Sequence, residues 1–513
     1  MKAISRRQLL VAGGSMAVVA ACSSNSGSGG SAAGKPVAAT DPAVAAREKL
    51  RASSGKVVTA NVTAAPVETT IAGKTVSTWA FGDTPSAGGL HVSAGDMLEA
   101  TFVNKLPSHN TVHWHGLALR NDMDGVHDLT MGSVEAGGQF TYRFTVPDPG
   151  TYWFHPHMGL ELDRGLYAPL IVEDPHEPLA YDLDVTLMLD DWLDGFGRTP
   201  EEVLAEMKKT GGHAHNMGNM GGMGNMGDMG NMMGSTNTTA MAGMSGMEPW
   251  AGDVVYPHHL INGRAANDRQ TIEAKPGQKV RIRIINAASD TAYRFGIAGH
   301  QLTVTHADGF PVEHVTVDHL MIGMGERYDV LVTAGDGAFP IIAAPEGKAD
   351  PYAEAVLRTN SDASPAAGSW PAELDGKGLS YSMLRTTQPL AARQPDRSES
   401  IMLTAGSHYV HGINEKSFPN TDPIVVHQGE RLRLTVMNHT MMFHPIHLHG
   451  HTFQLASGGT VGASTARKDT VNVMPMSAVA FDIEADNPGQ WMFHCHNTYH
   501  LEMGMATTLS YRV

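Results

Sequence analysis

The sequence predicts an all-β protein of three related β-sandwich domains, and two observations support this prediction. Glycine and proline are frequent, with 56 and 28 of 513 residues, which favours short strands over long helices. One pattern also occurs three times: a glycine precedes an asparagine at a fixed distance, with apolar residues third, fifth and seventh after the glycine. The copies are Gly95–Asn104, Gly277–Asn286 and Gly429–Asn438. Alternation with a period of two is typical of a half-buried strand, so each copy indicates one strand of one domain.

The length suits three domains of about 150 residues each. We expect a signal, a flexible tether and three domains, the second of which carries a methionine-rich insertion. In that order the segments are 1–22, 23–55, 56–175, 176–385 with the insertion at 211–247, and 386–513.

The first 22 residues have the pattern of a targeting signal. The pair Arg6-Arg7 precedes an apolar run that is too short to span a membrane. The run ends in Val19-Ala-Ala-Cys22, which resembles the lipobox of bacterial lipoproteins and predicts lipidation of Cys22. We expect export by the twin-arginine pathway and an extracytoplasmic, membrane-anchored lipoprotein of the periplasm or cell envelope.

The charge and the cysteine count restrict the possible partners. A formal net charge of −16 argues against nucleic acid as a partner and favours the attraction of cations. If Cys22 carries lipid, Cys495 is the only other cysteine, so no intramolecular disulfide is possible. Cys495 then serves in chemistry, as a metal ligand or as a small apolar residue.

The first and third copies of the strand pattern are each followed by two His-x-His pairs. The eight residues are His113, His115, His155, His157, His447, His449, His494 and His496. Residues i and i+2 of a strand point to the same face, so each pair presents two imidazoles to one metal site. The middle copy has Phe295 and Ile297 at the corresponding place. Because two domains each supply half of the histidines, we expect the metals at the interface between the first and third domains.

Cys495 lies between two of these histidines and therefore faces the opposite side of its strand. On that side it can meet His444 and His500, and Met505 follows five residues later. Two histidines, a thiolate and a thioether are the ligand set of a blue copper site and match neither common structural zinc set. The backbone beside Cys495 offers an electron a short covalent route between the two sites.

These motifs resemble those of the multicopper oxidases, and the likeness is greatest to three-domain bacterial members that include copper-resistance oxidases and lipoprotein forms. The resemblance implies three cupredoxin-like Greek-key domains and four copper ions. It implies a type 1 copper on His444, Cys495, His500 and Met505, a type 2 copper on His113 and His447, and a type 3 pair on His115, His155, His157, His449, His494 and His496. It also implies that electrons enter singly at type 1 and that O2 is reduced to water at the other three ions.

Two acids are candidate proton donors for oxygen reduction. Asp124 lies at the spacing from His113 at which family members have a carboxylate near the copper cluster, and Glu502 resembles an acid of fungal laccases. The alternative for both is an ordinary turn or surface carboxylate.

The predicted insertion repeats methionine every third residue, broken by glycine and asparagine. The repeat consists of Met217, Met220, Met223, Met226, Met229 and Met232. Thioethers favour Cu(I), so we interpret the segment as a collector of Cu(I) for the type 1 site. Copper-resistance oxidases of enteric bacteria have a similar segment, although in their third domain. A low-complexity linker is the alternative.

We expect a monomeric enzyme that oxidises Cu(I) with O2 in copper tolerance, anchored to a membrane through its N-terminal lipid. A methionine as axial ligand resembles lower-potential family members, which suits Cu(I) and easily oxidised diphenols. Oxidation of phenols, Fe(II) or Mn(II) is the alternative within the same class, and copper sequestration is the alternative outside it. The complete set of trinuclear ligands favours the enzyme and excludes a two-domain copper nitrite reductase.

Overall fold

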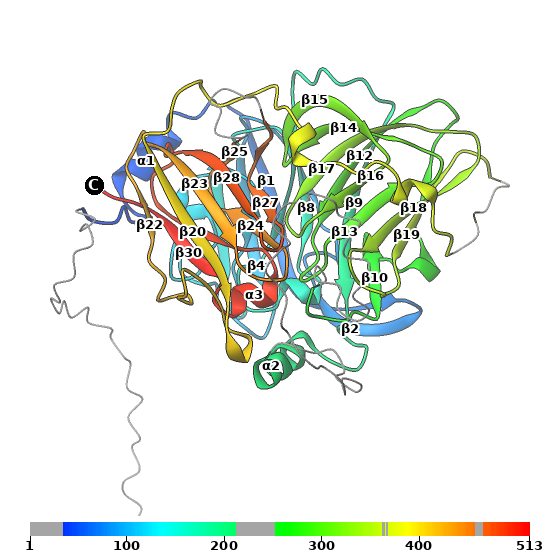
Figure 1. The fold of residues 1–513 in the computed structure, drawn as a ribbon, viewed down its shortest axis with the longest axis horizontal. Coiled ribbons are helices and arrows are strands. Elements are labelled where there is room, and N and C mark those ends of the chain that lie inside the picture. The colour runs from blue at the N-terminus through cyan, green and yellow to red at the C-terminus, as the bar shows by residue number, and fades with distance from the viewer. Residues whose placement is uncertain (1–33, 212–251, 362–364, 366–367, 457–464) are drawn as a thin grey trace, which may run out of the picture. The chain divides into compact units, whose positions relative to one another are not determined.

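The computed structural model describes residues 34–211, 252–361, 365, 368–456 and 465–513. The chain divides into two units, Met1–Gly34 and Lys35–Val513, and the fold below is that of the second unit (Figure 1). Its described residues form mostly strands, which pair into six sheets. The predicted signal and Cys22 lie outside the described residues, as does the methionine repeat.

The six sheets follow one another in the sequence as three pairs. The first pair has the orders β2-β1-β4-β6 and β3-β8-β7-β5. Its strands are β1 (Val57–Ile71), β2 (Lys74–Ala80), β3 (Leu90–Ser93), β4 (Met97–Asn104), β5 (His113–His115), β6 (Gln139–Thr145), β7 (Gly150–His155) and β8 (Ala168–Glu173).

The second pair has the orders β10-β9-β12-β17-β14-β15 and β11-β19-β18-β13-β16. Its strands are β9 (Leu183–Trp192), β10 (His258–Ile261), β11 (Thr271–Glu273), β12 (Lys279–Asn286), β13 (Tyr293–Ile297), β14 (Leu302–Ala307), β15 (Phe310–Val317), β16 (His319–Ile322), β17 (Arg327–Thr333), β18 (Ala338–Pro345) and β19 (Ala353–Arg358).

The third pair has the orders β21-β20-β23-β28-β25-β26 and β22-β30-β29-β24-β27. Its strands are β20 (Arg397–Ala405), β21 (His411–Ile413), β22 (Ile424–Val426), β23 (Arg431–Asn438), β24 (His444–Leu448), β25 (Phe453–Leu455), β26 (Arg467–Lys468), β27 (Thr470–Val473), β28 (Ala478–Glu484), β29 (Gln490–Cys495) and β30 (Ala506–Tyr511).

Helices are short and lie between strands. The α-helices are α1 (Pro42–Glu48), α2 (Pro200–Thr210) and α3 (Thr498–Glu502), and the 3-10 turns are η1 (Asn121–Met123), η2 (Leu162–Arg164), η4 (Ala266–Asp268), η5 (Ala372–Asp375), η6 (Tyr381–Met383) and η7 (Ser407–Tyr409). Among the described residues, no helix is both long and apolar enough to cross a membrane.

The repeated sequence pattern forms β4, β12 and β23, one strand in each pair of sheets. Each strand ends in a buried asparagine that holds the loop after it with the same three hydrogen bonds. In the third copy the Asn438 amide donates to the carbonyls of Met442 and Val473, and its oxygen accepts from the Thr440 amide. Asn104 and Asn286 bond equivalent positions. In the first and third copies this loop leads directly to the histidine motifs.

The predicted half-burial is correct for β4 and β23 but wrong for β12, which is buried on both faces. The reason is that Arg281 and Arg283, on its polar face, form ion pairs with Asp329 and Asp184 instead of facing water. In the sequence, buried arginines that form ion pairs give the same pattern as a polar strand face exposed to water.

Part of the predicted tether is folded, which corrects that expectation. Helix α1 begins after Asp41, whose side chain accepts a hydrogen bond from the Ala43 amide, and it buries Val44. The backbone of Lys35 also pairs with that of Val513 in both directions. This short helix therefore joins the folded unit because one apolar residue and its N-cap hold it there.

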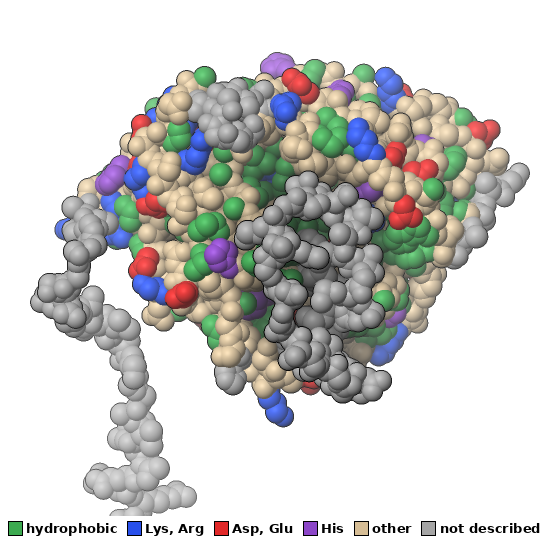
Figure 2. Space-filling view, in the orientation of Figure 1, with side chains coloured by type: hydrophobic (Ala, Val, Ile, Leu, Met, Phe, Trp, Pro, Cys, Tyr) green, Lys and Arg blue, Asp and Glu red, His purple; other side chains and the backbone are tan. Residues whose placement is uncertain are grey.

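Charged side chains of both signs are interspersed on the face shown in Figure 2, and its described part has no continuous basic surface.

Candidate metal centre

Four strands of the first and third pairs of sheets, β5, β7, β24 and β29, bring the eight paired histidines together. Five of the eight lie in these strands, and His157, His449 and His496 lie one or two residues beyond the ends of β7, β24 and β29. β5 pairs with β7 so that His113 lies opposite His155, and β24 pairs with β29 so that His447 lies opposite His494. Seven of the eight side chains are buried, and His157 is half-buried. The duplicated motifs thus contribute to one site, as the sequence predicted.

Three of these imidazoles form one group that contains residues of both domains. The Nε2 atom of His494 lies 3.0 Å from Nε2 of His449 and 3.5 Å from Nε2 of His157. These are the ligands expected for one ion of the type 3 pair.

The other five imidazoles lie beside this group. The rings of His115, His155 and His496 have centroids 4.9–5.7 Å apart, as expected for the second type 3 ion. The rings of His113 and His447, the expected type 2 ligands, are 5.7 Å apart.

The ring nitrogens are arranged for metal ions. On several rings one nitrogen is held by a backbone carbonyl: His113 Nδ1 lies 2.9 Å from the Asp124 oxygen, and His155 Nδ1 lies 2.9 Å from that of Pro156. Buried nitrogens without a hydrogen-bond partner are His113 Nε2, His115 Nδ1, His155 Nε2, His447 Nε2 and both ring nitrogens of His496. Because buried polar atoms are normally paired, so many free imidazole lone pairs fit a set of bound copper ions.

The electrostatics keep these rings neutral and ready to bind metal. Burial, and then repulsion from neighbouring imidazoles, lower the pKa well below its usual value for six of them, namely His115, His155, His157, His449, His494 and His496. Neutral imidazole is the form that binds copper.

The predicted type 1 residues meet on the opposite face of β29. The Cys495 sulfur lies 3.6 Å from Nδ1 of both His444 and His500, and these two nitrogens are 3.1 Å apart. Asn497 positions His500 because its side chain caps α3, which turns the chain back towards the cysteine. Met505 is fully buried, and its carbonyl accepts from the Cys495 amide at 3.0 Å.

Burial raises the pKa of the Cys495 thiol. A soft metal ion must therefore displace its proton, and the neighbouring neutral imidazoles complete a copper donor set.

Asp124 lies between two imidazoles that are predicted to bind copper, so it is not an ordinary turn carboxylate. Its Oδ2 lies 3.0 Å from His449 Nδ1 and its Oδ1 lies 3.3 Å from His113 Nδ1, in a fully buried position. One carboxylate thus contacts an expected type 2 ligand and an expected type 3 ligand, which come from different domains.

Glu502 occupies a different position, at the wall of an open cavity of about 750 Å3 that reaches the trinuclear histidines. His155, His157 and Lys208 line the same cavity. Desolvation at the wall raises the pKa of the Glu502 carboxyl, and Lys208 opposes this shift. Glu502 therefore shares this cavity with the histidines, but among the described residues it forms no hydrogen bond or ion pair with a predicted ligand.

Two further acids contact copper-binding residues and were missed in the sequence. Asp253 Oδ2 lies 3.0 Å from His500 Nε2, and Asp469 Oδ1 lies 3.2 Å from His115 Nε2. The carbonyl of Asp469 also accepts from His447 Nδ1 at 2.9 Å. The only available sequence signal was that Asp469 lies close to the histidine motif of the third domain.

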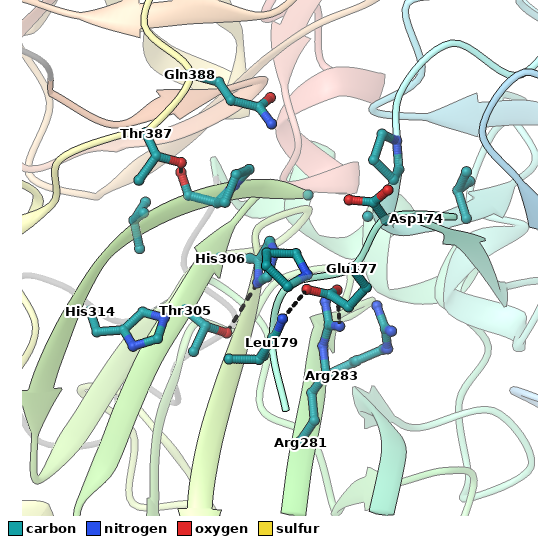
Figure 3. A pocket seen from close by; sticks show the side chains of 17 residues that line it. Asp174, Glu177, Leu179, Arg281, Arg283, Thr305, His306, His314, Thr387 and Gln388 are labelled. Carbon is teal, nitrogen blue, oxygen red and sulfur yellow. Dashed lines mark hydrogen bonds and ion pairs between the residues drawn. The ribbon is translucent and has the colours of Figure 1, made fainter. Parts of the chain in front are cut away.

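A separate cavity of about 340 Å3 contains none of the predicted copper ligands (Figure 3). Arg281 lines it and bonds Glu177 at 2.6 Å and Asp329 at 2.6 Å. Arg283 is occupied by Asp184. The cationic groups of this cavity are already paired within the protein.

Comparison with known proteins agrees with this geometry. Family models described as multicopper oxidase match residues 63–177, 230–362 and 390–513. The multicopper oxidase MmcO of Mycobacterium tuberculosis is 43% identical over 480 residues, which cover 91% of this chain and 90% of that protein. A copper resistance protein A homolog of Pseudomonas syringae pv. tomato is 28% identical over 80% of this chain and 85% of that protein. The chain belongs to the multicopper oxidase family.

Solved structures show the same fold. Fet3p, a multicopper oxidase that functions in iron import, superposes with a TM-score of 0.74 at 21% identity, covering 89% of this chain and 90% of that one. A multi-copper oxidase from Pseudomonas thermotolerans superposes with a TM-score of 0.66 at 26% identity, covering 89% of this chain and 100% of that one. The predicted family, cupredoxin-like fold, enzyme class and copper cofactors are confirmed.

Copper held by these residues would supply single-electron transfer from a reductant at the Cys495 site and four-electron reduction of O2 to water at the eight paired histidines. Carbonyl and carboxylate partners orient the imidazoles of this chain. The backbone joins Cys495 directly to His494 and His496, and carboxylates lie beside the imidazoles where protons would be consumed.

Proposed function

We propose that this multicopper oxidase oxidises Cu(I) to Cu(II) in copper tolerance. Four Cu(I) ions and four protons reduce one O2 to two waters and leave four Cu(II) ions. The observation that carries the proposal is a carboxylate, Asp253, on the outer edge of the type 1 ligand His500.

Asp253 is suited to receive a cation at the point of electron entry. Its Oδ2 accepts a hydrogen bond from the Tyr409 hydroxyl at 2.7 Å and lies 3.0 Å from His500 Nε2, and its side chain is 13% exposed. The ring of His411 stacks on that of His500 at 4.1 Å. A carboxylate and an imidazole, both against His500, favour a metal-ion reductant over a neutral molecule.

The position of Asp253 in the chain links this edge to the methionine-rich segment. Helix α2 precedes that segment and buries Met207 in one cluster with Tyr409 and Tyr499 (Figure 1). Asp253 follows the segment and bonds His500. The described residues on both flanks thus meet at the type 1 site, which supports the proposal that the methionines gather Cu(I) for it.

Oxygen uptake with Cu(I) as the only reductant tests the proposal. Three proteins are compared: the intact chain, a chain lacking 211–247, and a chain of full length in which the ten methionines of that segment are replaced by serine. We expect fast uptake by the intact chain and a large loss in both variants, while oxidation of a diphenol continues. Equal Cu(I) rates in all three would contradict the collecting role, and no uptake by the fully loaded, blue protein would favour copper sequestration.

Diphenol oxidation is the second candidate, because exposed apolar residues adjoin Asp253 and Tyr409 in the sequence. Val255 follows Asp253 by two residues and is 53% exposed, and Val410 directly follows Tyr409 and is 43% exposed. Exposed apolar side chains of this kind suit an aromatic ring. A kcat/KM for a diphenol that exceeds the value for Cu(I) would favour this reading.

The twin-arginine pair and the lipobox support a location outside the cytoplasm, with the protein anchored through lipid on Cys22. Replacing Cys22 by Ser should release the protein from the membrane fraction. Retention of that variant in the membrane would contradict the anchor.

A further inference from the structure

The domain that supplies no expected copper ligand forms a wall of the trinuclear site. The turn between β16 and β17 lies against the imidazoles, and Gly325 in it has a φ of +84°. A Cβ atom there would lie 2.9 Å from His496 and 3.0 Å from His115. Only a residue without a side chain allows this approach.

Arg327 begins strand β17 directly after this turn and reaches the site through Asp469. Its two terminal nitrogens lie 2.7 and 2.6 Å from the two carboxylate oxygens of Asp469, and both side chains are 0% exposed. Asp469 in turn contacts His115 Nε2 at 3.2 Å and, through its carbonyl, His447 Nδ1 at 2.9 Å. Arg327 is thus one residue removed from an expected type 3 ligand and an expected type 2 ligand.

The same interface contains a second buried cation that points the opposite way. Lys468 of the third domain lies 3.1 Å from Asp308 and 3.0 Å from Glu326 of the second domain. All three side chains are fully buried. The glycine of the first histidine motif also belongs to this arrangement. A Cβ atom on Gly116 would clash with the Arg327 guanidinium and lie 2.8 Å from an Asp469 oxygen.

Stability alone does not account for these buried charges. Exchanging a buried ion pair for well-packed apolar residues is often neutral or stabilising, because desolvation offsets the attraction. A guanidinium that grips a carboxylate at two points does fix its orientation, which a single ammonium group does not.

We propose that Arg327 is a positioning residue for the trinuclear copper centre. By holding Asp469 at two points, it fixes Oδ1 3.2 Å from His115 Nε2 and 2.9 Å from the Thr470 hydroxyl, which donates to it. The Thr470 oxygen in turn accepts from the Nε2–H group of His115 at 3.2 Å, so that Nδ1 of that ring is the nitrogen presented to copper. The partner of a ligating imidazole sets its tautomer and orientation, and losing such a partner typically weakens metal binding about 10- to 100-fold. The second domain thereby controls a site to which it gives no ligand.

The test compares three variants of the copper-loaded full chain. Arg327→Met removes both hydrogen bonds to Asp469, and Arg327→Lys keeps the charge but loses the two-point contact. Arg281→Met is the matched control. Arg281 is an equally buried arginine on the neighbouring strand β12, and it pairs with Asp329 and Glu177, neither of which contacts a copper ligand. Non-blue copper is titrated out with a chelator and followed by the type 2 electron paramagnetic resonance signal, while blue absorption monitors the type 1 site.

We expect Arg327→Met to bind its non-blue copper about 10- to 100-fold more weakly. Arg327→Lys should be intermediate, Arg281→Met should match the wild type, and all should keep the blue absorption. Any other order of affinities overturns the proposal, including equal loss in the two Met variants. If Arg327→Met gives no folded protein, Arg327→Lys decides alone: wild-type affinity and an unchanged type 2 signal overturn it, and weakened binding with intact blue absorption supports it.

Discussion

Replacing Asp124 by Asn should slow oxygen reduction about tenfold while leaving the blue absorption intact. The Asp124 Oδ2 atom lies 3.0 Å from His449 Nδ1, without exposure to water. A hydrogen bond to a charged group contributes about 1.5–3 kcal/mol and a neutral one about 0.5–1.5, so Asn loses about 1 to 1.5 kcal/mol at this contact. A loss of about 1.36 kcal/mol corresponds to a factor of ten in rate.

The assay is oxygen uptake at saturating reductant, with copper content and blue absorption measured on the same samples. Asp128→Asn is the control, because Asp128 lies in the same loop with its side chain 84% exposed. The reasoning is refuted if Asp124→Asn keeps four copper ions and turns over within threefold of the wild type. Equal loss in both variants would instead indicate a disturbed loop.

Three other changes test other parts of the structure. Cys495→Ser should abolish the blue absorption and reduce oxygen uptake to background with every reductant, while three copper ions per chain remain by metal analysis; retained uptake would contradict the electron route. Asn438→Ala and Asn286→Ala should each lower the free energy of unfolding by about 2–4 kcal/mol, since each asparagine side chain makes at least three hydrogen bonds. Only Asn438→Ala should shift the blue absorption, because its loop holds Thr440 against His444 at 2.7 Å, and equal spectra would count against this link. Burial lowers the pKa of His500 to about 4, so between pH 6.5 and 4 the unfolded chain binds a proton that the folded, copper-free chain does not. Copper-free protein should therefore lose about 3 kcal/mol from this residue as the pH falls to 4, and thermal unfolding that does not change between pH 7 and 4.5 would contradict the assignment.

The sequence was sufficient to predict which histidines lie together, and that Cys495 lies with His444 and His500, because this information is local. Alternation along a strand fixes which face each histidine takes, and duplication of the motif shows that the pairs are not accidental. The same alternation places Cys495 opposite His494, and the structure has that geometry. Neither inference depends on which strands pair with one another in the sheets.

Among the partners of those ligands, Asp124 was indicated by the family resemblance, whereas Asp469 and Arg327 required the folded structure. Asp124 follows its type 2 histidine by 11 residues and Asp469 follows His447 by 22, so no common spacing connects the two acids. Arg327 is 142 residues from Asp469 in the sequence. Its role depends on how the second and third domains pack, which the sequence pattern does not reveal. The buried arginines of β12 show the same limit, because a polar strand face can equally well be buried.

Asp124 and Asp469 nevertheless have related positions around the centre. In each domain the backbone oxygen of the aspartate accepts from the type 2 histidine of its own domain, and the carboxylate contacts a type 3 histidine of the other. The second domain removes this symmetry, because Arg327 occupies both oxygens of Asp469, whereas Asp124 Oδ1 has no hydrogen-bond partner. Asp469 is therefore held in one orientation, and Asp124 keeps one carboxylate oxygen available for a proton. Duplication of a metal-binding motif accounts for the ligands, but the unequal roles of the two acids follow from the third, ligand-free copy.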